Sequence, residues 1–335
     1  MPAVASRRKA LALAAVLIAG CLPAALVSGS GFSELGSAAL YGTFIALAGV
    51  MYGWKTGTWL SAIGGLAGIG SQLVHPYPIL GALFFGLLTA ACALTARRGL
   101  HAAFMMVPMF TSFLLMSPIS VGAEGSLLGS ALIVGAVMTA SGLWLVAVTR
   151  LVGGKGMPVA DLHGFSIAAT RGYATILGSV VGISAGILLF VDPAHTSAWL
   201  LLTLVVVMQP SLHDSMNKTW QRLGGTVLGA ALTIPITFGL SSFAPSVTLA
   251  IGVIAMFIAF SLRYVLKRQY WQYVAPLTVG IILLDATSAT QAAVTIDRVG
   301  FTFLGSVIAI GVALVVKSQL VRSEEQGLSG NVHCG

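Results

Sequence analysis

Twelve runs of apolar residues, each close to the length that crosses a lipid bilayer, divide most of this sequence. They lie near residues 10–28, 37–54, 57–74, 77–95, 101–118, 125–149, 172–191, 195–210, 223–241, 245–262, 269–286 and 299–317. A membrane-spanning helix needs about 20 apolar residues, and lipid provides no partner for backbone groups that secondary structure leaves open. Only 8% of the residues are charged, against about 25% in a soluble domain. We therefore predict an all-α, polytopic membrane protein, a bundle of about 12 transmembrane helices.

The charges predict an orientation for these helices. If the N-terminus is cytoplasmic, 16 of the 17 basic residues fall on the inner side, and only Arg298 falls outside. Basic loops stay in the cytoplasm, so we expect both termini to be cytoplasmic. The beginning of the chain permits a second interpretation, because basic residues 7–9 followed by an apolar run that reaches Cys21 resemble a signal segment that is removed.

Two stretches in the C-terminal half repeat the same residue types. Arg222-Leu-Gly224-Gly-Thr226-Val-Leu-Gly229 matches Arg298-Val-Gly300-Phe-Thr302-Phe-Leu-Gly305. The two arginines are an odd number of predicted spans apart, so the repeat would be inverted across the membrane. Inverted repeats are typical of secondary transporters. The simpler explanation is that small residues recur in any packed membrane helix.

The repeat and the span count suggest four parts. Residues 1–150 would form a first six-helix half, and residues 151–171 a short Gly-rich cytoplasmic linker. Residues 172–317 would form a second six-helix half with a 3+3 inverted repeat, followed by a cytoplasmic tail at 318–335.

A succession of motifs runs from about residue 165 to residue 317. It consists of Arg171, the run from Trp199 to Gln209-Pro210, the Arg222 stretch, Tyr270-Trp271 and the Arg298 stretch. This succession resembles the fusaric acid resistance protein-like family of bacterial inner-membrane proteins, which includes aromatic acid exporters. The resemblance implies proton-driven export of organic acids, aromatic carboxylic acids among them, across the bacterial inner membrane. Two alternatives stay open, an anion channel and a non-transporting membrane scaffold.

An exported carboxylate needs positive potential along its path, and we expect Arg222 and Arg298, with Thr226 and Thr302, to line that path. Guanidinium binds carboxylate through two parallel hydrogen bonds and keeps its charge. Each arginine is expected at a helix N-terminus, where the helix dipole adds positive potential. The alternative for Arg222 is an anchor at the lipid headgroups.

Proton coupling needs a titratable group, and Asp192 and Asp285 are the acidic candidates because acids within membrane spans are usually functional. Both lie near predicted span ends, so a solvated helix end is the simpler interpretation. Candidates for helix packing or for hinges are the small and helix-breaking residues of the second half, Gly224, Gly229, Pro235, Pro276, Gly300 and Gly305.

The sequence carries no enzymatic motif. Gly153-Gly-Lys155-Gly156 lacks the spacing and the Ser or Thr of a phosphate-binding loop. No set of His, Cys or acidic residues has metal-ligand spacing, so we expect neither a metal nor a cofactor. The expected partners are the lipid bilayer and a small organic anion rather than nucleic acid, and a homo-oligomer is left open.

Overall fold

The computed structural model describes residues 15–122, 126–153, 162, 164–191, 197–240, 245–285 and 291–331. Throughout these ranges the regular secondary structure is helical, without a β-strand, which confirms the all-α prediction. The helices are α2 (Leu22–Ser28), α3 (Gly36–Val50), α4 (Trp54–Val74), α5 (Pro78–Leu94), α6 (His101–Phe104), α7 (Met106–Met116), α8 (Leu127–Val148), α9 (Ile167–Val191), α10 (Ala198–Val207), α11 (Leu212–Leu240), α12 (Pro245–Phe260), α13 (Tyr270–Asp285) and α14 (Gln291–Asn331).

Each predicted apolar run coincides with helical structure, and α6 and α7 share the fifth run. Local signals explain several helix starts. Pro78 occupies the first turn of α5, where its missing N–H costs no hydrogen bond. The side chain of Ser126 accepts a hydrogen bond from the backbone N–H of Gly129 (3.0 Å) and caps α8. Gly53 adopts a φ of 115°, which favours glycine, and turns the chain from α3 into α4.

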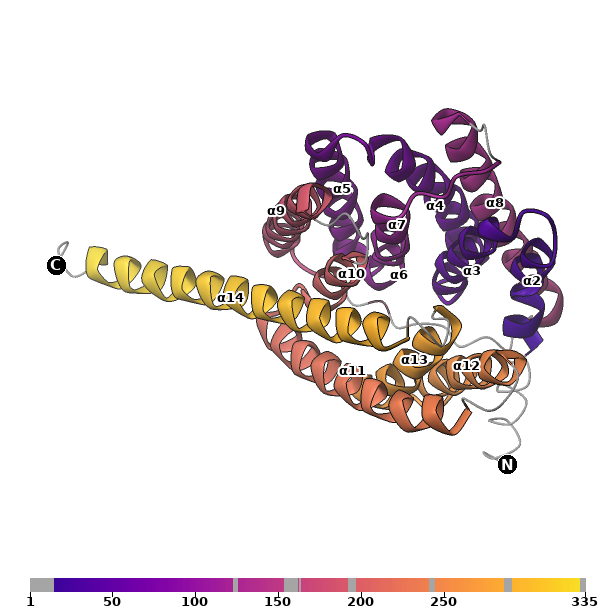
Figure 1. Ribbon diagram of the computed structural model, residues 1–335. Coiled ribbons are helices and arrows are strands. Elements are labelled where there is room, and N and C mark those ends of the chain that lie inside the picture. The colour runs from indigo at the N-terminus through magenta and orange to yellow at the C-terminus, as the bar shows by residue number, and fades with distance from the viewer. Residues whose placement is uncertain are drawn as a thin grey trace, which may run out of the picture.

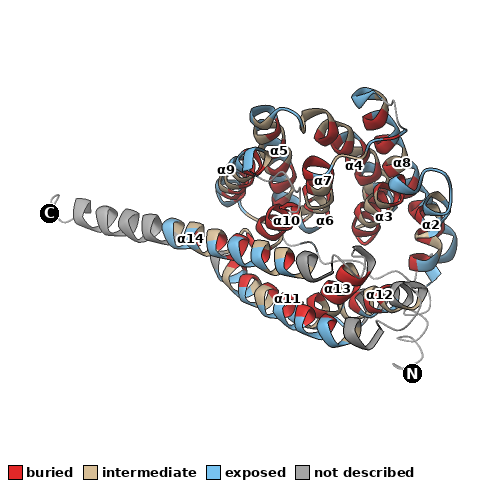
Figure 2. Ribbon diagram, viewed as in Figure 1, coloured by how far each residue is buried: buried red, intermediate tan, exposed pale blue. Residues whose placement is uncertain are grey.

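Five helices within the described ranges are long and apolar enough to cross a membrane. They span Ser33–Val50, Pro78–Arg98, Leu127–Val152, Ile167–Val191 and Thr295–Val316. The outer faces of α5 and α9 are exposed (Figure 2), and they carry large apolar side chains such as Leu83, Leu87, Ile183 and Phe190. An exposed apolar belt of this kind matches a lipid environment. The chain is therefore a helical membrane protein, and the count of twelve spans stays a prediction.

Several helix boundaries differ from the predicted spans. Helix α11 begins at Leu212 rather than near residue 223, and α14 begins at Gln291 rather than near 299. Helix α9 begins at Ile167, inside the segment expected to be linker. Hydropathy marks only the apolar part of a helix, whereas the backbone hydrogen bonds of a helix continue through flanking polar residues. Much of the expected linker, residues 154–161 and 163, lies outside the described residues.

The helices form two groups (Figure 1). Helices α3, α4, α5, α6 and α10 pack around α7, with α2, α8 and α9 further out, and α11 to α14 lie together along one side of that body. Helix α9, expected to open the second half, packs along α5 of the first half at the small residues Gly86, Gly178 and Gly182. A Cβ on Gly182 would lie 3.0 Å from Gly86 Cα. The two backbones therefore touch, as small residues permit in membrane helices.

Helices α11 and α14 carry the two repeated stretches, and their burial repeats as well. Buried, half-buried and exposed positions agree between residues 222–230 and 298–306, except at Gly225 and Phe301. In each stretch a glycine packs against a threonine of a neighbouring helix. It also packs against the backbone carbonyl of the residue three positions before that threonine. A Cβ on Gly229 would lie 2.6 Å from Thr278 Cβ and 2.5 Å from Ala275 O. A Cβ on Gly305 would lie 3.0 Å from Thr203 Cβ and 3.3 Å from Leu200 O.

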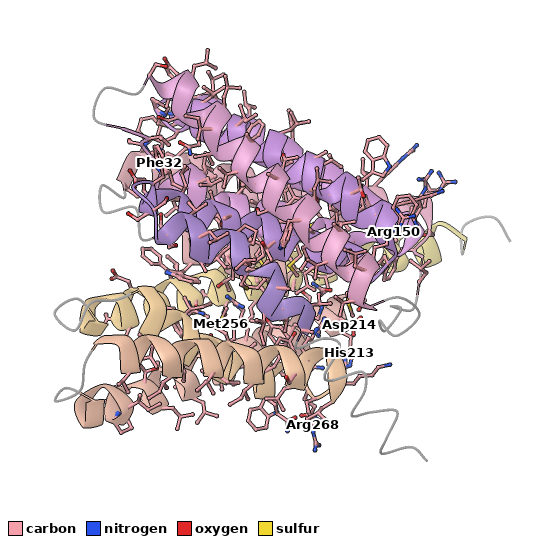
Figure 3. The ribbon with its side chains drawn as sticks, turned by 90° about the vertical axis from the view of Figure 1, so that its right-hand side faces the viewer. Phe32, Arg150, His213, Asp214, Met256 and Arg268 are labelled. Carbon is pink, nitrogen blue, oxygen red and sulfur yellow. The ribbon has the colours of Figure 1, made fainter. Side chains whose placement is uncertain are left out.

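The loops expected on the inner side gather at one end of the bundle. Arg150, His213 and Asp214 lie at one end of the helices, and Phe32, from a loop expected outside, lies at the other (Figure 3). This arrangement agrees with the alternation of loops used to orient the chain.

Candidate anion pathway at helix α10

Helix α10 is the element on which the candidate site is built. It has ten residues, and all of them except Val206 are buried. It packs against α7, α9, α11 and α14. The helix ends at Val207, and the backbone of Met208 turns to an extended conformation two residues before Pro210. Within the apolar segment of α10, Thr203 is the one hydroxyl side chain.

Arg222 reaches α10 from α11. Its side chain is only 5% exposed. Its Nε donates a hydrogen bond to Thr203 Oγ1 (3.2 Å), and its Nη1 donates to the hydroxyl of Tyr270 on α13 (3.0 Å). Both partners are neutral hydroxyls, so these contacts orient the guanidinium without neutralising its charge.

Arg298 reaches the same helix from α14. It is 3% exposed, and its Cζ lies 3.9 Å from the centroid of the Trp199 ring, a cation–π contact. Phe113 of α7 meets the Trp199 ring edge to face, with centroids 4.8 Å apart. Tyr41 of α3 stacks on Phe113 at 5.6 Å, so an aromatic row connects the first half of the chain to Arg298.

The two arginines therefore meet α10 one turn apart. Thr203 Oγ1 accepts from Arg222 and donates to the carbonyl of Trp199 (2.7 Å), whose ring lies under Arg298. Four residues of helix separate the two contacts by about 6 Å along its axis. Two stretches of chain that are 76 residues apart (298 − 222) bring two positive charges to one buried segment.

The expected placement of both arginines at helix N-termini is wrong. Arg222 follows ten helical residues of α11, and Arg298 follows seven of α14. The helix dipole acts mainly within the first turn, so it adds little at either guanidinium. The positive potential at α10 comes from the side chains themselves.

The predicted threonines lie on the same buried faces. Thr226 and Thr302 are each 1% exposed. The hydroxyl of Thr302 has no hydrogen-bond partner among the described residues, and neither has the hydroxyl of Thr278, the packing partner of Gly229. A buried hydroxyl without a partner is unfavourable in a closed protein interior.

The other predicted residues take different positions. Asp192 lies outside the described residues. Asp285 is the last residue of α13, and its side chain also lies outside the description. Pro235 and Pro276 stand inside α11 and α13, as expected. Of the four glycines, Gly229 and Gly305 make close helix contacts, whereas a Cβ on Gly224 or Gly300 would have nothing within 4 Å.

Sequence reasoning missed the role of Thr203 and used Trp199 and Tyr270 only as parts of the motif succession. A signal for Thr203 was present, because a lone hydroxyl in an otherwise apolar run needs a partner. The pairing of Trp199 with Arg298 had no such signal, since hydropathy does not encode which helices are neighbours.

Comparison with known proteins is informative for the second half of the chain. Residues 183–312 match the model of the fusaric acid resistance protein-like family, which confirms the resemblance over that segment. The matched segment contains α10, Arg222 and Arg298. No curated protein matches the chain, and no solved structure does. Among the described residues, no group of three or more His, Cys, Asp or Glu side chains could hold a metal ion.

Proposed function

We propose, taking the match of residues 183–312 to the fusaric acid resistance protein-like family as the premise, that this chain is a secondary transporter. It exports small organic acids, aromatic carboxylic acids among them, across the bacterial inner membrane, and the proton gradient drives the export. Both termini lie in the cytoplasm. The family is one of membrane transport and efflux, and the chain has apolar helices of spanning length.

The convergence of Arg222 and Arg298 on α10 is the observation that carries this proposal. A buried guanidinium is unfavourable unless it is paired and hydrogen-bonded. Among the described residues, the two hydrogen-bond acceptors of Arg222 are neutral hydroxyls, so an organic anion at α10 would add a negative charge that these contacts do not provide. The ring of Trp199 lies beneath the second guanidinium, that of Arg298, so this segment combines positive charge with an aromatic side chain, two features that suit an aromatic carboxylate.

The repeated packing in α11 and α14 supports a carrier. In an inverted-repeat transporter, the two units exchange conformations when the site opens from one side to the other. Here the two units would be α9–α11 and α12–α14. Arg222 on α11 donates a hydrogen bond to Thr203 on α10, which belongs to the same unit. Thr278 holds the corresponding position in the other unit, as the partner of Gly229, and its hydroxyl is not hydrogen-bonded by any described residue. Exchange of the two units would bring Arg298 to Thr278.

Flux of labelled benzoate from proteoliposomes tests the proposal. Arg222→Gln and Arg298→Gln each remove one buried charge, and charge-assisted hydrogen bonds contribute about 1.5–3 kcal/mol, so we expect flux to fall roughly 10- to 100-fold. Arg150→Gln is the matched control, because Arg150 is exposed and lies over Trp54 at the far end of α8. Full flux in both buried-site variants, at normal expression, contradicts the proposal.

The same vesicles separate the alternatives. A carrier gives flux that follows the imposed pH gradient. Current that follows voltage without a pH gradient indicates a channel, and the absence of flux and current indicates a scaffold.

A further inference from the structure

The inner end of the α10–α11 connection holds a second cluster of polar side chains. Lys218 precedes Arg222 by one turn on the same side of α11, and its Nζ donates a hydrogen bond to Gln209 Oε1 (2.8 Å). The amide nitrogen of Gln209 donates to the carbonyls of Val206 (2.8 Å) and Met208 (3.2 Å), at the end of α10. These contacts fix the carboxamide, so its oxygen faces Lys218.

His101 of α6 joins this cluster from the first half of the chain. Its ring lies close enough to Gln209 and Lys218 to interact with both side chains. The ring is held edge to face against Phe165, with centroids 5.9 Å apart. Its Nδ1 is buried and has no hydrogen-bond partner among the described residues. Basic side chains from both halves of the sequence therefore lie near one carboxamide, and Lys218 is hydrogen-bonded to it.

The charges around Lys218 are mostly positive. The titratable and charged groups that act on it are Asp214 on its own helix, His101 on α6, and Arg263 in the turn Ser261–Val265 that follows α12. Arg222 lies one turn further along α11. Burial, followed by the positive charge of Arg263, lowers the pKa of Lys218 to about 8, although Asp214 acts in the opposite direction. Lys218 thus changes charge close to the pH of the cytoplasm, which an ordinary lysine does not.

We propose that Lys218, held by Gln209 at the inner end of α10, is a further positive group of the anion pathway, whose charge strengthens anion binding at Arg222. The inference rests on the proposed transport function and adds a pH-dependent binding residue at the inner end of the same pathway. Because its proton and the anion bind together, Lys218 is not the site of the proton that drives export.

The coupling has a definite sign. Lys218 and Arg222 are four residues apart on one helix, so their Cβ atoms are neighbours at about 5–6 Å. A protonated Lys218 therefore attracts an anion bound at Arg222, and at an effective dielectric constant of about 20 this attraction changes affinity by tenfold or more. By reciprocity, the bound anion favours the protonated lysine, so binding takes up a proton. Anion affinity therefore falls as the pH rises through the pKa of Lys218.

Calorimetric titration of the purified full-length protein with benzoate, from pH 6.5 to 9.5, tests this coupling. Titration in two buffers of different ionisation enthalpy also counts the protons taken up. For the wild type we expect affinity to fall about tenfold across this range, with proton uptake greatest near pH 8 to 9. Lys218→Met should bind benzoate more weakly at pH 7, without pH dependence and without proton uptake. Lys218→Arg should keep the pH 7 affinity and lose the pH dependence, because guanidinium stays charged.

Two further variants separate this inference from the proposed function. Lys55→Met removes an exposed lysine that lies over Trp54, and it should leave the pH dependence unchanged. Arg222→Gln should weaken binding roughly 10- to 100-fold at every pH, which concerns the proposed function alone. If Arg222→Gln weakens binding in this way while Lys218→Met keeps the full pH dependence and proton uptake, the role of Lys218 is wrong and the anion pathway stands. If the wild type binds no benzoate at any pH, both are overturned.

Discussion

Replacing Gly229 by alanine would add one methyl group where α11 meets α13. That methyl carbon would lie 2.5 Å from the carbonyl oxygen of Ala275 and 2.6 Å from Thr278 Cβ. Neither atom is the end of a flexible side chain, so the two helices have to separate. Overpacking of this kind costs about 1–3 kcal/mol. Gly224 lies on the same helix, and a Cβ there would meet nothing within 4 Å, so Gly224→Ala is the matched control.

The helix-propensity gain of alanine over glycine, about 0.5–1 kcal/mol, is common to both variants and cancels in their comparison. We therefore expect Gly229→Ala to be about 1–3 kcal/mol less stable than Gly224→Ala. Unfolding in mixed micelles with increasing denaturing detergent, followed by circular dichroism, measures this difference. Equal stability of the two variants would refute the packing argument, and so would a Gly224→Ala variant that is the weaker of the two.

Three further predictions concern the α10 site and its inner end. Thr203→Val leaves Arg222 Nε without its acceptor, which should cost about 1–3 kcal/mol in the same unfolding assay, whereas Thr203→Ser should restore most of the loss. Trp199→Leu removes the ring beneath Arg298 and also changes the local packing. The same substitution in an Arg298→Met background measures the packing change alone. We expect loss of the cation–π contact to lower the free energy of unfolding by about a further 0.5–2 kcal/mol. The folded state lowers the pKa of Lys218 to about 8 from its ordinary value of 10.5, so the folded state binds fewer protons than the unfolded state between these limits. The melting temperature of the wild type relative to Lys218→Met should therefore rise with pH over this window, and a flat or falling difference would contradict the burial of the lysine.

The apolar runs were sufficient to place the helices. Each run carries its own backbone hydrogen bonds, and its length is set by the thickness of the bilayer, so no knowledge of neighbouring helices is needed. The spacing of residues in the repeated stretches also decides which of them share a helix face, because the side-chain period of a helix is a local property. Arg222, Thr226, Gly229 and their equivalents in the Arg298 stretch all lie on the buried side.

Boundaries were predicted less well where helices continue into polar sequence. Residues 212–221 contain His213, Asp214, Lys218 and Gln221, and hydropathy therefore assigned them to a loop. In the structure they extend α11, because contacts such as Lys218 with Gln209 satisfy their polar groups. The helix-dipole argument for Arg222 failed for this reason.

The tertiary structure alone decided which helices are neighbours. Nothing in the order of apolar runs indicates that α9 packs on α5, or that α11 and α14 bring two arginines to one turn of α10. Those pairings depend on side-chain shape at positions far apart in the chain, such as Gly305 against Thr203 and the Trp199 ring against Arg298. Hydropathy is a sum over neighbouring residues and contains no term for such contacts. The sequence alone thus determined a bundle of apolar helices with two repeated arginines, and only packing decided that these arginines meet at one helix.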